Sequence, residues 1–351
     1  MRKLLYFVFA LALLVSGTEA YSQMNRRNIK KNNKRISSFR GKKSHFGKEK
    51  RYNAIGFSVN ALNYYGDLAP RPSRFSTDIS FTRPALAISW THRFGPRYSI
   101  TGSFMYGTLK GSDTESAHQG DEKNGIFRYQ RNLSFRNRIK EFTVVATFDL
   151  FENQSTYISR VKWTPYAFLG ITGFFHNPQA KAPETDLNGT PLPEAGKWVD
   201  LQPLGTEGQY ADLLSTDANS GIKKYHKFQP AIPFGIGARL RINEVIDLAA
   251  EIGFRYTFTD YLDDVSKNYV DLGKLDSELA KAMSYRTGEI VPYDFEYEST
   301  ADNKTYRVKR GYGSESKTNN RGNKNDKDVY MVTTIRVTYI LGKTFHRAKF
   351  R

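Results

Sequence analysis

The clearest strand pattern in the chain is PAIPFGIGARLRINEVIDLAAEIGFRYTF, residues 230–258. Every second residue is apolar from Ile232 to Ile242 and again from Ile246 to Phe258, and a turn of about three residues separates the two runs. A period of two is that of a β-strand, so each run has one apolar face and one face of glycine and charged residues. Strands of 11 to 13 residues are long for a water-soluble sheet but match a tilted transmembrane strand, whose apolar face would meet lipid.

Six other runs alternate in the same way. The predicted strands are about 52–62, 84–94, 97–109, 140–151, 163–175, 232–242, 246–258 and 329–341. The connections between them alternate strictly between short and long. The long ones are about 63–83, 110–139, 176–229 and 259–328. This pattern predicts an all-β fold, an eight-stranded antiparallel transmembrane β-barrel of the outer-membrane type, with long external loops and both termini periplasmic.

The ends of the chain predict export. Arg2 and Lys3 precede an apolar run from Leu4 to Val15 and then small residues, which is the pattern of a signal peptide over 1–22. A basic, disordered periplasmic arm is expected over 23–51 and a basic periplasmic tail over 343–351, on either side of a barrel over 52–342.

The positive charge of the chain is concentrated near its N-terminus. The chain has a net charge of +18, and residues 25–51 hold twelve Lys or Arg and one Glu. A nucleic-acid partner would be the interpretation for a cytosolic protein, but the signal peptide argues against it. The arm is expected to meet anionic lipid headgroups, peptidoglycan or an acidic periplasmic partner instead. The chain has no cysteine, which excludes disulfides and thiol chemistry.

Charged residues at alternate strand positions are expected to point into the barrel. An eight-stranded barrel is just wide enough for side chains to fill, so these charges should pair as a structural plug, with a proton or substrate path as the alternative. The predicted lumen cluster is Asp149, Arg239, Arg241, Asp247, Glu251, Arg255 and Arg336.

No motif indicates catalysis, a cofactor or a small-molecule substrate. The six histidines have no ligand spacing, and Gly235-x-Gly237 lacks the third glycine of a dinucleotide loop. The weak metal candidates are Asp260, Asp263 and Asp264, which could bind Ca²⁺ at an external strand end but more often cap a turn. The polar stretch 299–328 is expected to be mobile.

Several phrases of the chain resemble a known family. They are YNAIGFSVNALNYYGDLAP, FLGITGFFHNPQA, LQPLGTEGQ, QPAIPFGIGAR and EIGFRYTFTDYLDDVS, and they fall within residues 52–342. The phrases resemble the small outer-membrane barrels of Bacteroidota related to PorG, the barrel subunit of the type IX secretion system. The resemblance implies a non-enzymatic barrel that anchors the periplasmic ring of the secretion machine, and it supplies no catalytic residues.

The sequence therefore predicts a non-enzymatic outer-membrane barrel, a structural subunit of a protein secretion machine, in contact with outer-membrane lipid and periplasmic subunits. One alternative is a surface receptor or adhesin that binds an external ligand through loops 176–229 and 259–328. The other is a narrow channel or a lipid-modifying barrel enzyme.

Overall fold

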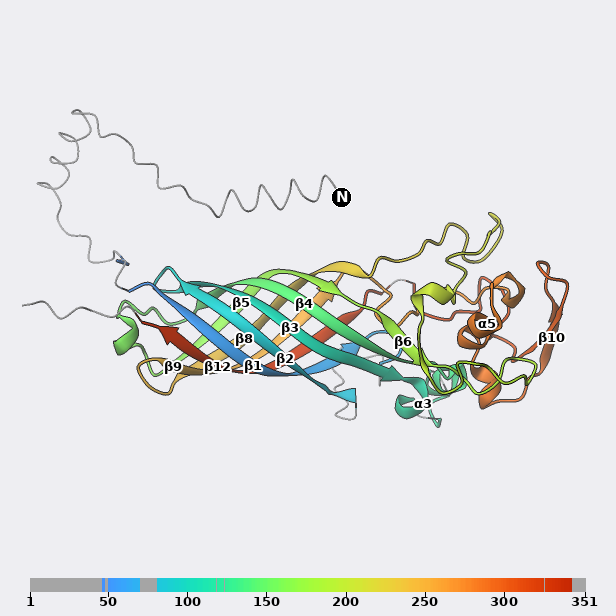
Figure 1. Ribbon diagram of the computed structural model, residues 1–351, viewed down its shortest axis with the longest axis horizontal. Helices are drawn as coiled ribbons and strands as arrows, with labels where there is room; N and C mark the ends of the chain where they lie inside the picture. The colour runs from blue at the N-terminus through green and yellow to red at the C-terminus, as the bar shows by residue number, and fades with distance from the viewer. Residues whose placement is uncertain are drawn as a thin grey trace, which may run out of the picture. The chain divides into compact units, whose positions relative to one another are not determined.

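Eight long antiparallel strands close into a barrel in this computed structural model, which describes residues 46–47, 50–69, 81–117, 119–122, 124–324 and 326–342. The barrel strands are β1 (Tyr52–Tyr65), β2 (Arg83–Arg93), β3 (Tyr98–Ser112), β4 (Ser134–Asp149), β5 (Trp163–Phe175), β8 (Phe228–Arg241), β9 (Ile246–Thr257) and β12 (Val329–Leu341). Their order is β3-β2-β1-β12-β9-β8-β5-β4, and β3 also pairs with β4. The predicted eight-stranded barrel is confirmed (Figure 1).

The connections differ at the two ends of the barrel. Three short ones, 94–97, 150–162 and 242–245, share one end, here called the turn end. The first strand starts at this end and the last strand finishes there. The opposite end, here called the loop end, carries all four long connections. The predicted signal peptide, the tail and most of the basic arm fall outside the described residues.

The opening segment forms the hairpin β8–β9. Ile236 pairs with Ile252 and Leu240 with Leu248, so the apolar residues of the two strands share one face. In the turn, the Asn243 side-chain oxygen accepts from the backbone N–H of Val245 at 2.9 Å and of Ile246 at 2.8 Å. A side chain that bonds to its own backbone in this way fixes a tight turn.

The outer face of the barrel is an apolar belt. Phe57, Ile88, Phe142, Ile236 and Ile335 each expose between 52% and 67% of their surface. Aromatic side chains are exposed on both sides of this belt. Those toward the turn end are Trp90, Phe94, Tyr98, Phe148 and Trp163, and those toward the loop end are Tyr106, Phe175, Phe228 and Tyr256. An outward apolar band between aromatic girdles is the surface of a transmembrane barrel.

Strand β4 begins six residues before its predicted start at 140. In this extension the faces are reversed, because Phe135 and Ile139 are buried inside while Arg138 and Lys140 are exposed outside. Beyond the lipid, the outer surface meets water and the interior can hold an apolar core. A prediction that requires apolar residues on the outer face of each strand therefore does not detect this part of β4.

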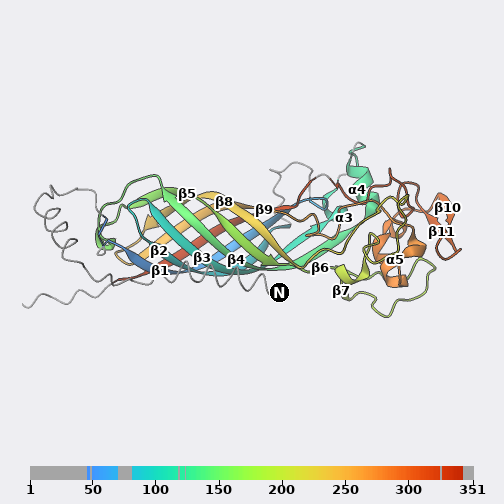
Figure 2. The same ribbon diagram turned by 90° about the horizontal axis from the view of Figure 1, so that it is seen from above.

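The long connections fold into a cap at the loop end (Figures 1 and 2). Its elements are α3 (Asp113–Ser116), α4 (Gly125–Arg131), β6 (Pro178–Lys181), β7 (Trp198–Asp200), α5 (Glu278–Ser284), β10 (Phe295–Glu298) and β11 (Thr305–Val308). The cap has a core of its own, which contains Tyr269, Leu272, Tyr285 and Val308. In the part of the chain that the structure describes, no helix has the length and hydrophobicity to span a membrane.

Candidate functional site

The lumen near the turn end holds a buried carboxylate between two guanidinium groups. Asp149 Oδ2 accepts from Arg93 Nη1 and from Arg239 Nη2, each at 2.7 Å. The Asp149 side chain is 1% exposed and that of Arg93 is 3% exposed. Two cations around one carboxylate compensate a charge that would otherwise be costly to bury. The two ion pairs of Asp149 link strands β2, β4 and β8.

Two further ion pairs lie in the same part of the lumen. Glu251 accepts from Arg336 Nη2 at 2.5 Å and from the Tyr166 hydroxyl at 2.6 Å. Asp247 accepts from Arg160 Nη2 at 2.6 Å. Arg160 reaches Asp247 from the β4–β5 connection. The same end of the barrel holds a small apolar cluster that includes Tyr52 and Ile340, with Tyr157 packed against it.

Nearer the loop end, a third lumen group joins β4, β9 and β12. Glu141 accepts from Arg255 Nε at 2.9 Å and from the Tyr330 hydroxyl at 2.7 Å. Its side chain is 1% exposed. The predicted cluster contained Arg255 but omitted Glu141, although Glu141 alternates with the outward residue Phe142 and this signal was readable in the sequence.

The ion pairs of the lumen differ from the predicted cluster in three further residues, Arg93, Arg160 and Arg241. Arg93 and Arg160 are partners that the cluster omitted. The position of Arg93 follows from strand alternation, whereas that of Arg160 depends on how a loop folds back. Arg241 lies apart from the ion pairs, because its Nη1 donates to the backbone carbonyls of Ile158 and Arg160 at the barrel rim.

The lumen is packed with side chains. The cavity among Arg93, Tyr166, Arg239, Glu251 and Arg336 has a volume of about 30 Å³, which is room for one or two waters. Toward the loop end, the interior is an apolar core that includes Leu62, Leu109, Phe135, Ile139 and Phe174. Gly235 and Gly237 make room for this packing: an added Cβ would lie 2.7 Å from the Phe168 ring at the first and 2.8 Å from the Tyr166 ring at the second.

Where the barrel meets the cap, a tyrosine hydroxyl lies between two carboxyl groups. Tyr64 Oη is 2.7 Å from Asp263 Oδ2 and 2.7 Å from Asp328 Oδ1. One hydroxyl proton can be donated to only one of them, so the other carboxyl must keep its own proton to donate to the tyrosine oxygen. The group therefore holds a proton that two ionised aspartates would lack.

Burial sets the protonation of this acidic group. It raises the pKa of Asp328 to about 7, and together with repulsion from the Asp328 carboxylate it raises the pKa of Asp260 to about 8. Burial also raises the pKa of Asp263 well above its ordinary value. The ionised forms lose hydration and repel one another, so the neutral forms are favoured near neutral pH.

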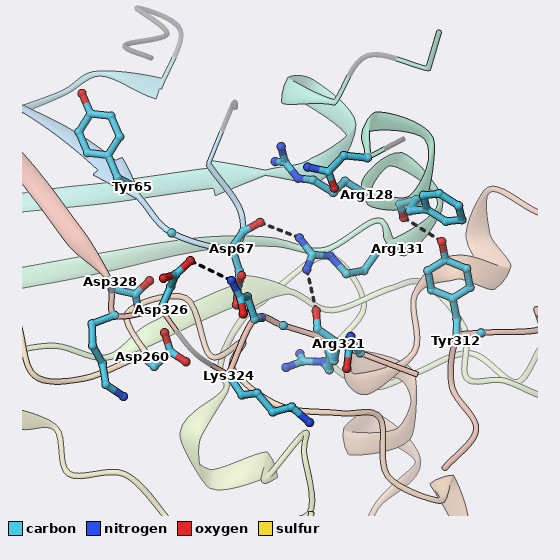
Figure 3. A pocket seen from close by; sticks show the side chains of 18 of the residues that line it. Tyr65, Asp67, Arg128, Arg131, Asp260, Tyr312, Arg321, Lys324, Asp326 and Asp328 are labelled. Carbon is cyan, nitrogen blue, oxygen red and sulfur yellow. Dashed lines mark hydrogen bonds between the residues drawn. The ribbon is translucent and has the colours of Figure 1, made fainter. Parts of the chain in front are cut away.

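A cavity of about 670 Å³ opens beside this acidic group (Figure 3). Its walls carry cations and carboxylates together with Tyr65, Phe127 and Tyr312. The charged lining residues are Arg128, Arg131, Arg310, Arg321, Lys324, Lys327, Asp67, Asp260, Asp326 and Asp328. The volume is within the range of small-ligand sites, which is roughly 300–1,000 Å³.

Two buried arginines hold the cap loops around the cavity. Arg131 pairs with both carboxylate oxygens of Asp113, at 2.8 and 2.9 Å, and also donates to the carbonyls of Asp67 and Arg321. Arg321 is 2% exposed and pairs with Glu207 at 3.1 Å. All four long connections are thus joined by charged hydrogen bonds.

The expectation of a mobile stretch over 299–328 is wrong for much of its length. Asn268 Nδ2 donates to the carbonyls of Ser316, Lys317 and Asn319, and Arg321 is buried. The backbone of this stretch is thus held by a cap side chain, and Arg321 in turn donates to the backbone carbonyl of Asp264.

The three weak metal candidates bind different parts of the cap. Asp260 accepts from Ser266 Oγ at 2.6 Å, and Asp263 accepts from the backbone of Val265 at 3.0 Å. Asp264 accepts from the hydroxyls of Thr206 at 2.5 Å and Tyr225 at 2.7 Å. Within the described ranges, no three acidic, histidine or cysteine side chains are grouped to hold a metal ion.

Comparisons with known proteins give a partial match and a set of structural likenesses. Residues 43–188 match a family described as a domain of unknown function, DUF6089. No curated protein matches the chain.

Three solved barrels illustrate the structural likeness. The outer membrane protein OprG from Pseudomonas aeruginosa is 9% identical, with 84% of this chain and 97% of that chain covered and a TM-score of 0.35. Neisserial surface protein A is 10% identical over 82% and 96% of the two chains, with a TM-score of 0.33. Ail of Yersinia pestis is 8% identical over 83% and 97%, with a TM-score of 0.29. Scores this low carry no argument, and the fold rests on the strand pairing described above.

Proposed function

We propose that the protein is a non-enzymatic outer-membrane barrel that acts as an anchor and does not conduct. The observation that carries this proposal is the filled lumen, where Asp149, Glu141 and Glu251 are each paired with arginine. The void beside Glu251 has a volume of only about 30 Å³. A closed, packed barrel offers rigidity and membrane attachment rather than a path for solutes. The apolar belt and the predicted signal peptide support the location.

The finer proposal is a structural subunit of the type IX protein secretion machine that contacts its periplasmic ring. Its support is the sequence resemblance, together with the position of the strand ends. Both β1 and β12 meet the flanking segments at the turn end, so the basic arm 23–51 and tail 343–351 would leave the barrel on one side. Their positive charge suits an acidic periplasmic surface.

The test is crosslinking in intact cells, followed by extraction in mild detergent and mass spectrometry of the proteins that co-purify. We expect periplasmic secretion subunits, in amounts that fall as salt rises. Replacing Arg26, Arg27, Lys30 and Lys31 with glutamine should reduce the association without loss of the folded barrel. A matched change at four exposed cap cations, Lys223→Gln, Lys224→Gln, Lys304→Gln and Lys317→Gln, should leave it unchanged.

The second candidate is a surface receptor, and the cap favours it. Its loops are packed around a cavity of about 670 Å³ that combines aromatic rings with charges of both signs. Two results together would favour the receptor over the anchor. No periplasmic partner would co-purify with the barrel. The wild-type protein would bind an external ligand, and the variant with Arg310→Glu and Lys327→Glu would not bind it. A steady conductance in planar bilayers would contradict both and favour the channel.

A further inference from the structure

The outer face of β4 changes character along its length. From Phe148 to Phe142 its outward residues are apolar, and Phe142 is 60% exposed. The next three outward residues are all cations, Lys140, Arg138 and Arg136. We call these three residues the cationic strip.

Aromatic residues flank the start of the cationic strip. Lys140 is paired in register with Tyr106 on β3 and with Phe175 on β5. These two rings are 47% and 56% exposed. Aromatic side chains of this kind mark the boundary between hydrocarbon and headgroups, so Lys140 lies at the boundary.

Strand geometry places the strip in the headgroup layer. A strand rises about 3.3 Å per residue and tilts by about 40°, so each second residue moves about 5 Å along the membrane normal. Lys140 and Arg138 thus lie about 5 and 10 Å beyond Phe142, across a headgroup layer that is roughly 5–8 Å thick. The long side chain of Arg136 can reach back toward the same layer.

The strip has no protein anion to neutralise it. Among the described residues, Lys140 and Arg138 form no ion pair, and Arg136 donates to the neutral Gln179 at 3.1 Å and lies 3.8 Å from the Trp198 ring. By contrast, Lys110, which is paired in register with Arg136, is neutralised by Glu115 at 2.8 Å. Three neighbouring cations repel one another unless anions are supplied from outside the chain.

We propose that Lys140, Arg138 and Arg136 form a binding site for the anionic phosphate groups of lipid headgroups in the leaflet at the loop end. The site rests on the membrane insertion proposed above. A guanidinium can hold a phosphate through two parallel hydrogen bonds, while Lys140 contributes a point charge at the boundary. Bound phosphate would fix the depth and rotation of the barrel in its leaflet.

The test is a titration of the detergent-solubilised full chain with diphosphorylated lipid A, followed by native mass spectrometry. We expect the charge reversals Lys140→Glu and Arg138→Glu together to weaken lipid A binding at least tenfold. The matched control is Lys304→Glu with Lys317→Glu, which reverses two exposed cap cations and should change binding less than twofold. Phosphatidylcholine, whose phosphate is neutralised by its own choline, should bind equally to all variants.

Two controls keep the outcome clear. Flotation with phosphatidylcholine vesicles measures insertion, so a wild-type chain that fails to float contradicts the membrane anchor and not the strip. If the double reversal does not fold, Lys140→Gln with Arg138→Gln takes its place. Lys140→Arg, which keeps the positive charge, should bind lipid A as the wild type does. Equal lipid A affinity in the wild type and the strip variant overturns the proposal, as does an equal loss in the cap control.

Discussion

Tyr64 Oη and Asp328 Oδ1 lie 2.7 Å apart where the first barrel strand ends and the last begins. Asp263 approaches the same hydroxyl at 2.7 Å from the cap. The two hydrogen bonds therefore join barrel closure to cap folding, and burial raises the pKa of one of their carboxyl groups, Asp328, to about 7.

The cap should become less stable as the pH rises. The pKa values of Asp328, about 7, and Asp260, about 8, are raised in the folded protein, whereas in the unfolded chain both are close to 4. Between about pH 4 and pH 8 the folded state binds more protons, so the free energy of unfolding falls across that range. Limited proteolysis of the cap should be slow at the acidic end and faster at the alkaline end.

Asp328→Asn should reduce this pH dependence. The asparagine amide can donate to Tyr64 and its oxygen can still accept from the backbone of Leu262, so it mimics the protonated aspartate. We expect stabilisation on the order of 3 kcal/mol at the alkaline end. Asp212→Asn, at an exposed cap position, serves as the control. An unchanged slope in Asp328→Asn would show that the pH dependence arises elsewhere.

The lumen ion pair Glu251–Arg336 predicts a strong single-mutant effect. Glu251→Leu leaves Arg336 and the Tyr166 hydroxyl without their acceptor and should cost about 3–5 kcal/mol. The temperature at which the folded band is lost on SDS gels should fall. Glu251→Leu with Arg336→Met removes both charges and should recover much of the loss. Unchanged heat resistance in Glu251→Leu would indicate a hydrated lumen.

The closed hydrogen-bonded barrel should resist SDS. Because all eight strands have partners on both sides, unfolding requires the whole ladder to open. Unboiled protein should therefore migrate differently from boiled protein, with a circular dichroism spectrum dominated by β-structure. A mainly helical spectrum, or identical migration, would contradict this architecture.

The two ends of the barrel should lie on opposite sides of the membrane, with the loop end outside. A peptide tag after Asn303, in the exposed β10–β11 turn, should be labelled on intact cells, and a tag after Asn243 should be labelled only after the membrane is opened. Labelling at Asn243 alone would invert the orientation.

Strand number, faces and end-to-end asymmetry could be read from the sequence because lipid imposes a strict period of two. From Ile232 to Ile242 each outward position must be apolar, and each inward position can be polar. The alternation within one strand therefore shows which of its faces meets lipid and which faces the lumen. Where the lipid ends, this constraint ends too, and the extension of β4 before residue 140 was missed for that reason.

Contacts between distant parts of the chain required the tertiary structure. Strand alternation identifies Glu141 as inward, but only closure of the barrel brings it to Arg255, and only the fold of a loop brings Arg160 to Asp247. The cap is a stronger case, because Tyr64, Asp263 and Asp328 come from segments up to 264 residues apart. The environment of a loop does not repeat along the chain, so it imposes no periodic pattern on the sequence. From the sequence alone, polar loop residues are expected to be solvated. In the folded cap they are buried because they form hydrogen bonds with one another.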